Sequence, residues 1–169
     1  MKYIKTYEDV KSESDLHFIL CNFLEKIDKS KFKVNHVIYE KGKNYGRSLS
    51  FEIIKQGRNT SFWGEKLTRA FTLRITPVND KKLRSESIKP KIKILLDSIY
   101  YTDDDTALTL IDFMTEIFKK YSYFNKKLVS FNNNKNGKYE FYINTSDIEN
   151  IENDLKDFEF FISSNKYNL

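Results

Sequence analysis

Apolar residues recur along this chain with two different spacings, and the change from one spacing to the other limits the folds that it can adopt. Between residues 12 and 28 they recur at three- and four-residue intervals, which predicts a helix with one apolar face and Ser12 as its N-cap. Three runs then follow, 33–40, 48–55 and 70–78, that are rich in β-branched or aromatic residues and bounded by turn residues. Apolar and polar residues alternate in the last run, so we expect half-buried antiparallel strands.

The second half of the chain mixes the same two spacings. Residues 88–99 have helical spacing, and a longer helix is predicted over 104–121. The runs 128–131 and 139–143 flank an Asn-Gly pair, which predicts a hairpin. A last helix is predicted to begin after Ser146, which is followed by a glutamate at the capping-box position.

The predicted order of elements is αβββααββα. It indicates an α+β fold of two layers, in which an antiparallel sheet of about five strands carries helices mainly on one face. A length of 169 residues fits a single domain over 1–169, with a soft boundary near 79–88 where a polar run interrupts the pattern.

The composition excludes several classes of protein. One cysteine, Cys21, cannot close an intrachain disulfide, and with two histidines it cannot assemble a four-ligand zinc site. The sequence has no P-loop, dinucleotide-binding glycine motif, serine-hydrolase elbow or HExxH motif, so we expect no cofactor and favour binding over catalysis. No run of about 18 apolar residues occurs, which favours a cytoplasmic protein without a membrane-spanning segment.

Charge is distributed unevenly along the chain. Residues 31–93 hold 16 basic and 5 acidic side chains, a net charge of +11, whereas residues 94–169 have a net charge of −5. A basic segment of this size attracts phosphate. The alternative is that lysine-rich loops only keep the protein in solution.

Basic and aromatic residues are mixed most densely between residues 41 and 74. Single-stranded nucleic acid is held by cations along its phosphates and by aromatic faces on which bases stack. We therefore expect a site here for nucleic acid or for a nucleic-acid-processing protein, with Trp63 as an anchor in a long loop; alternatively, Trp63 covers a sheet edge. The predicted site residues are Lys41, Lys43, Tyr45, Arg47, Lys55, Arg58, Phe62, Trp63, Lys66, Arg69 and Arg74.

A second basic run precedes and enters the predicted helix over 88–99. Free N–H groups at a helix N-terminus bind anions, so this run is a further candidate for phosphate contacts; the alternative is a solvated linker. Its members are Lys81, Lys82, Arg84, Lys89, Lys91 and Lys93.

Two other functions remain open. The first is a phage or mobile-element inhibitor, of the anti-CRISPR or anti-restriction type, whose last helix uses acidic side chains in place of phosphates. These side chains are Asp147, Glu149, Glu152, Asp154, Asp157 and Glu159. The second is a metal-dependent nuclease that uses the carboxylates of residues 103–105, but capping of the predicted helix accounts for them and no metal is expected.

Overall fold

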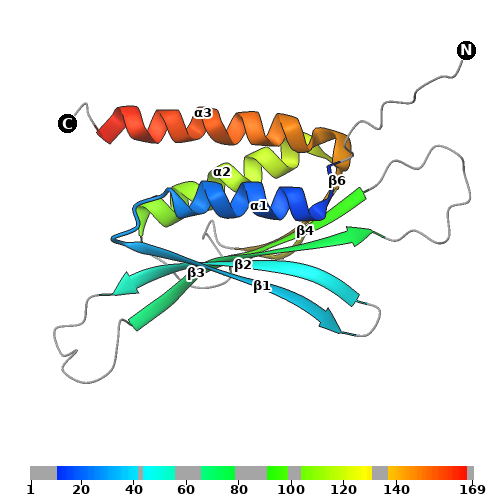
Figure 1. Ribbon diagram of the computed structural model, residues 1–169, viewed down its shortest axis with the longest axis horizontal. Helices are drawn as coiled ribbons and strands as arrows, with labels where there is room; N and C mark the ends of the chain where they lie inside the picture. Colours follow the sequence, from blue (N-terminus) through cyan, green and yellow to red (C-terminus); the bar gives the residue numbers. More distant parts are fainter. Residues whose placement is uncertain are drawn as a thin grey trace, which may run out of the picture.

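The structure is a computed structural model that describes residues 11–41, 44–55, 66–78, 91–98, 104–130 and 137–166. Within these ranges the chain forms helices and strands that are joined into one assembly (Figure 1). In chain order the elements are α1 (Glu13–Glu25), β1 (Phe32–Lys41), β2 (Asn44–Lys55), β3 (Lys66–Val78), β4 (Lys91–Asp97), α2 (Asp105–Tyr121), β5 (Ser122–Ser130), β6 (Gly137–Asn144), a 3₁₀ turn (Thr145–Asp147) and α3 (Ile148–Lys166).

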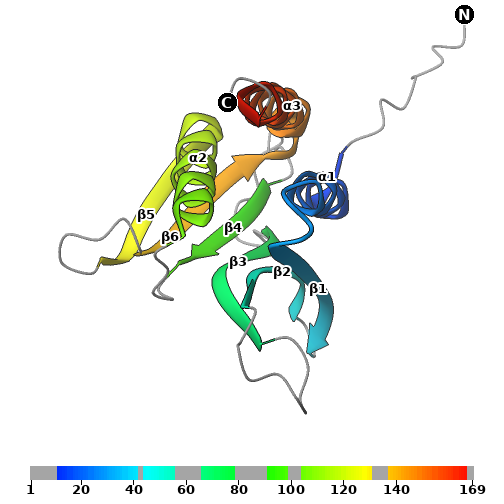
Figure 2. The same cartoon turned by 90° about the vertical axis from the view of Figure 1, so that its left-hand side faces the viewer.

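The strands form one antiparallel sheet in the order β1-β2-β3-β4-β6-β5. The helices lie on the same face of this sheet: α1 covers the half formed by β1 to β3, α2 covers the half formed by β5 and β6, and α3 packs on both helices (Figures 1 and 2). The opposite face carries no described helix. None of the described helices is both long enough and apolar enough to cross a membrane.

Aromatic side chains form much of the core between the helices and the sheet. Phe32, Phe51 and Phe71 stack in series across β1, β2 and β3, with ring centroids 4.8 and 5.1 Å apart. Phe118 of α2 meets Phe141 of β6 at 5.5 Å in the other half. Each fully buried ring contributes about 1.5–3 kcal/mol, so this face fixes the register of the strands.

The first two helices begin with the caps predicted from the sequence, whereas Ser146, predicted to cap the last helix, lies within the 3₁₀ turn and α3 begins at Ile148. Ser12 and Asp15 form a capping box at α1, in which the Asp15 carboxylate accepts a hydrogen bond from the Ser12 N–H at 2.6 Å. Asp104 caps α2 by accepting from the Ala107 N–H at 3.1 Å, and it also pairs with Lys31 at 2.6 Å. Asp104 therefore acts as a cap, as predicted, and ties the start of α2 to the turn before β1.

The α+β class and the arrangement of helices on one face are confirmed, but the helix predicted over 88–99 is wrong. Residues 91–97 form β4, a central strand, and the sheet has six strands. Ile92, Ile94 and Leu96 are buried at a spacing of two, while the residues between them are half-buried. Over residues 88–99 the apolar residues also have helical spacing. Hydrogen bonding to β3 on one side and to β6 on the other outweighs this spacing and stabilises the strand.

Candidate nucleic-acid interface

The residues predicted for the binding site are spread over the β1–β2–β3 part of the sheet and over ranges that are not described. Lys43, Arg58, Phe62 and Trp63 lie outside the described residues, so the role of Trp63 stays a prediction. For the others the strand is known: Lys41 ends β1, Tyr45, Arg47 and Lys55 lie on β2, and Lys66, Arg69 and Arg74 lie on β3.

The sheet separates these positions by a large distance. Tyr45 lies near one end of β2 and Lys55 at the other, which corresponds to about 34 Å at 3.4 Å per residue. Lys55 and Lys66 are directly opposite each other in the register. The set therefore occupies two ends of a long ribbon and its middle, and does not form one compact cluster.

Even the arginines of the set point to different faces. Arg47 pairs in register with Ile75, a buried residue on the helix-covered face, and its positive charge helps to lower the pKa of buried His17. Arg74 pairs with Ser48 and Leu95 on the opposite face and is exposed. Arg69 lies on that same face, 4.0 Å from the Glu52 carboxylate.

The register identifies every described side chain on the face away from the helices, which we call the open face. Because successive residues of a strand alternate between faces, the partners of Arg74 and Lys93 define it across the sheet. Seven of its described residues are basic: Lys33, Arg69, Arg74, Lys91, Lys93, Lys126 and Lys138. Three are acidic: Glu52, Asp97 and Glu140.

The acidic residues of the open face are all engaged by neighbours. Asp97 pairs with Lys138 at 3.5 Å, and Glu140 with Lys93 at 3.4 Å. Glu52 also accepts a hydrogen bond from the Asn35 amide at 2.6 Å. With seven basic and three acidic side chains among the described residues, the open face has a net positive charge.

Aromatic side chains gather at one end of the open face. Tyr123 and Phe124, at the start of β5, are 50% and 52% exposed. Both rings pack beside Tyr142 of β6, with centroids 6.2 and 5.6 Å from it. The Lys91 ammonium group lies 4.7 Å from the centroid of Tyr123. We call Tyr123, Phe124, Tyr142 and Lys91 the aromatic cluster.

Hydrogen bonding fixes the central ring of this cluster. The Tyr142 hydroxyl donates to the Glu140 carboxylate at 2.6 Å. That hydrogen bond, with a further contribution from Lys93, lowers the pKa of Glu140, although partial burial acts in the opposite direction. Glu140 is therefore ionised at neutral pH and holds both the Tyr142 ring and the Lys93 ammonium group.

The cations and the rings lie in adjacent rows that run across the strands. One row consists of Thr76, Lys93, Tyr142 and Phe124, which are successive partners on β3, β4, β6 and β5. The next row consists of Arg74, Leu95, Glu140 and Lys126. Strands are about 4.8 Å apart, so each row spans about 14 Å.

The sequence prediction did not include the aromatic cluster. Its signal lies in residues 138–142, where Lys138, Glu140 and Tyr142 alternate with core residues and thus share the face away from the helices. Lys91 and Lys93 belong to the second basic run, but the helix predicted there hid their alternation on a strand. Tyr123 and Phe124 begin a strand directly after α2, earlier than the hairpin predicted from 128.

Cys21 and His17 are buried side chains of α1, four residues apart. Burial, followed by the nearby Glu25 carboxylate, raises the pKa of the Cys21 thiol to about 11, so it is not a thiolate at neutral pH. His17 contacts the His36 ring at 5.8 Å. No group of three or more metal-binding side chains occurs within the described ranges.

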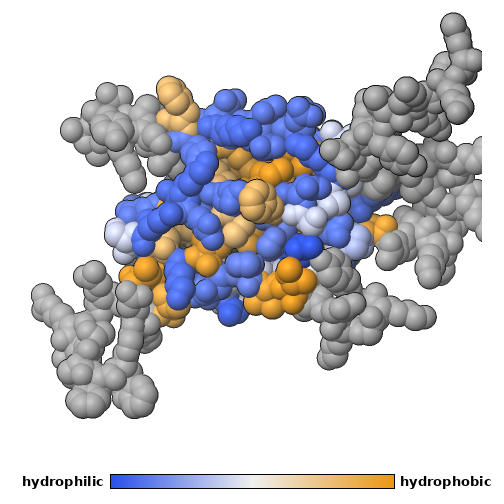
Figure 3. Space-filling model, viewed as in Figure 1, coloured by the Kyte–Doolittle hydropathy of each residue, from blue (hydrophilic) through white to orange (hydrophobic). Residues whose placement is uncertain are grey.

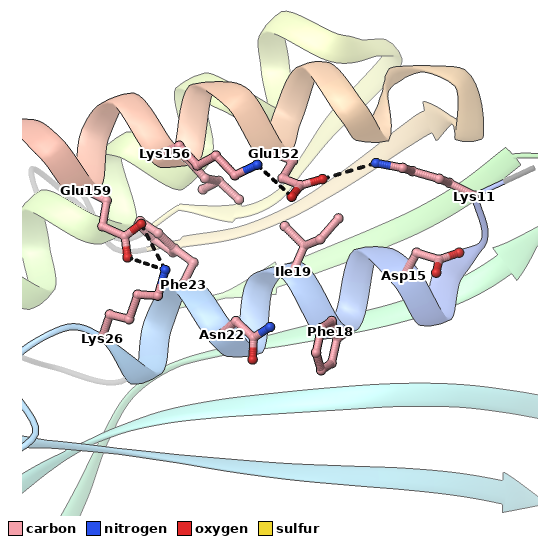
Figure 4. Close-up of a pocket in the computed structure, with 11 residues that line it drawn as sticks. Lys11, Asp15, Phe18, Ile19, Asn22, Phe23, Lys26, Glu152, Lys156 and Glu159 are labelled. Atoms are coloured by element: carbon pink, nitrogen blue, oxygen red, sulfur yellow. Dashed lines mark hydrogen bonds and ion pairs between the residues drawn. The ribbon is translucent and has the colours of Figure 1, made fainter. Parts of the chain in front are cut away.

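The acidic side chains predicted on the last helix are partly neutralised by the chain itself. Glu152 pairs with Lys11 and Lys156, and Asp154 with Lys120, while Glu159 pairs with Lys26. The space-filling view shows hydrophobic residues gathered between α3 and α1 under this polar surface (Figure 3). The close-up shows the pairs to Lys11 and Lys26 crossing the groove between the two helices, over Ile19 and Phe23 (Figure 4).

Comparisons with known proteins give no family for this chain. No protein-family model, no curated protein and no solved structure matches it.

Proposed function

We propose that this protein is a nucleic-acid-binding module that contacts phosphates through the open face of its sheet. The observation that carries the proposal is the excess of basic over acidic side chains on that face. Arg74 and Lys126 lie at the two ends of one row, about 14 Å apart on β3 and β5, while Lys93 lies two strand positions and Lys91 four strand positions from that row on β4. Such an array matches the charge of a polynucleotide, whose phosphates dominate affinity.

The alternative of a protein inhibitor with a phosphate-like acidic helix receives less support. Glu152, Asp154 and Glu159 already pair with lysines of the segment before α1, of α2 and of the C-cap of α1. A partner that needed these carboxylates would have to displace those lysines. Asp147 in the 3₁₀ turn and Glu149 and Asp157 on α3 remain, which is a smaller acidic surface than the sequence predicts.

The test is a salt titration of binding to labelled single-stranded DNA and RNA, read by fluorescence anisotropy. If Arg74, Lys91, Lys93 and Lys126 each neutralise one phosphate, log K should fall with log salt at a slope of about −2.8. Affinity should then drop roughly 50-fold between about 50 and 200 mM salt. Absence of binding to both nucleic acids at about 50 mM salt would contradict the proposal and favour a protein partner.

A matched pair of charge reversals separates the open face from net charge. Arg74→Glu lies at the centre of the open face, whereas Lys29→Glu changes the net charge equally in the exposed turn between α1 and β1. Arg74→Glu should weaken binding and reduce the magnitude of the salt slope by about 0.7, the contribution of one phosphate contact, while Lys29→Glu should change the slope far less. Equal effects of the two variants would show that binding follows net charge and not this face.

A further inference from the structure

We infer that the strand bound on the open face is an unpaired polynucleotide whose bases stack on Tyr123 and Phe124, an inference that rests on the proposed function. Charge alone does not distinguish single strands from duplexes, because both carry phosphates. The aromatic cluster does distinguish them. In a duplex the faces of the bases are covered by stacking within the helix, whereas in a single strand they are free to stack on aromatic side chains.

The two outer rings of the cluster are half-exposed without covering the core. Tyr123 and Phe124 lie on the edge strand β5 and expose about half of their surface, although large aromatic rings are usually well buried. Their partner on β6, Tyr142, is itself in contact with both. Tyr123 and Phe124 therefore present aromatic surface on a supported base and not on a mobile tip.

The neighbours of these rings match the chemistry of a nucleotide. Glu140 orients Tyr142 through the 2.6 Å hydrogen bond, and Lys91 lies over Tyr123, so the cluster is largely formed before a ligand arrives. Lys93 is the register partner of Tyr142 on the next strand, and Arg74 lies one row away on β3. A strand that crosses the sheet from β5 to β3 would thus place bases on the rings and phosphates near Lys93 and Arg74.

The positions of the cations also argue against a duplex as the main ligand. The rows that join Phe124 to Thr76 and Lys126 to Arg74 cross a twisted open sheet (Figure 2). A helix is the element that most often enters a groove of duplex DNA, and no described helix lies on this face. A duplex would contact the cations through one backbone only and would leave Tyr123 and Phe124 without a partner.

The experiment compares single strands and duplexes of one sequence, about 12 nucleotides long, in DNA and in RNA. The wild-type chain should bind the single strand at least about tenfold more tightly than the duplex, because stacking adds to the phosphate contacts. The double variant Tyr123→Ala/Phe124→Ala should lose at least about tenfold in affinity for the single strand and less than about twofold for the duplex.

Two control variants exclude folding and surface effects. Tyr123→Phe/Phe124→Tyr keeps both rings and should bind the single strand within about twofold of the wild type. Phe160→Ala removes a 77% exposed ring from α3, on the helix layer, and should leave binding unchanged. Thermal melting of each variant identifies any loss of binding that follows from unfolding.

The possible failures are distinct. If the wild type binds neither single strands nor duplexes at low salt, the proposed function fails and the inference fails with it. If single strands and duplexes bind equally well, and the double alanine variant binds both as the wild type does, the proposed function stands and the stacking inference is overturned. An equal loss for both ligands in a folded double variant also overturns it.

Discussion

The two faces of the sheet carry opposite kinds of side chain, although they are formed by the same strands. On β3, Leu73 and Ile75 are fully buried under the helices, while Arg74 between them is exposed on the open face. On β6, Phe141 is fully buried and its neighbour Tyr142 belongs to the aromatic cluster. Because a strand alternates between its two faces, one segment encodes both a requirement of folding and a surface available for function.

The comparison also explains the uneven charge of the sequence. Arg69 and Arg74 of β3 and Lys91 and Lys93 of β4 lie on the open face, while the acidic residues of α3 lie in the helix layer. There, lysines of the helix layer pair with them, as Lys26 does with Glu159 and Lys120 with Asp154. The basic charge of β3 and β4 and the acidic charge of α3 thus lie in different layers of the fold. The open face of the sheet therefore has a net positive charge.

The largest expected difference between the two faces is in the stability of two variants whose substitutions lie three residues apart on β3. Phe71→Ala removes a fully buried ring from the stack with Phe51 and should lower the free energy of unfolding by about 3–5 kcal/mol. Arg74→Ala, on the other face, should change it by less than about 0.5 kcal/mol. Denaturant unfolding measures both. A cost for Arg74→Ala close to that for Phe71→Ala would mean that the open face also carries the stability of the fold.

A second test uses acid, because the helix-covered face contains a histidine that resists protonation. His17 is 6% exposed, and burial, together with the charges of Arg47 and His36, lowers its pKa to about 4 from an ordinary 6.5. Above pH 6.5 the imidazole is neutral in both the native and the unfolded state. As the pH falls from 6.5 to 4, only the unfolded state takes up the proton, so stability should fall by a total of about 3 kcal/mol.

Two variants check the origin of this acid sensitivity. His17 Nε2 is buried without a hydrogen bond among the described residues, so His17→Leu should flatten the stability profile between pH 6.5 and 4 without a large cost at pH 7. His36→Gln should keep most of the sensitivity, because burial, the largest cause, remains. An unchanged profile in His17→Leu, measured by urea unfolding at each pH, would assign the acid sensitivity to other groups.

The sequence predicted the helix-covered face better than the open face, for a physical reason. Burial of apolar side chains leaves a periodic signal, which located α1, α2 and the strands up to Val78. The segment of β4 was misread because Ile92, Leu95 and Leu96 also fit a helical spacing, and only its neighbours β3 and β6 decide between the two. Open-face contacts such as Tyr123 with Tyr142 join residues from different strands, and a single sequence does not contain the pairing that joins them.

The smallest expected effect is the loss of stability when one tyrosine hydroxyl is removed on either face of β6. Tyr142→Phe removes the hydrogen bond to Glu140, which is the largest cause of that residue's lowered pKa, so the pKa should rise toward its ordinary value. The stabilisation from a lowered carboxyl pKa is present above pH 4.5 and is lost as the pH falls through the lowered value. Tyr142→Phe should therefore cost about 1 kcal/mol or less at pH 7 and a smaller amount at an acid pH at which Glu140 is protonated. Tyr139→Phe is the matched control, since Tyr139 stacks on Phe141 toward the helices and its hydroxyl has no hydrogen bond among the described residues. Urea unfolding at both pH values, with an NMR titration of Glu140, measures the difference, and equal costs for the two variants would show that the Tyr142 hydroxyl does not organise the open face.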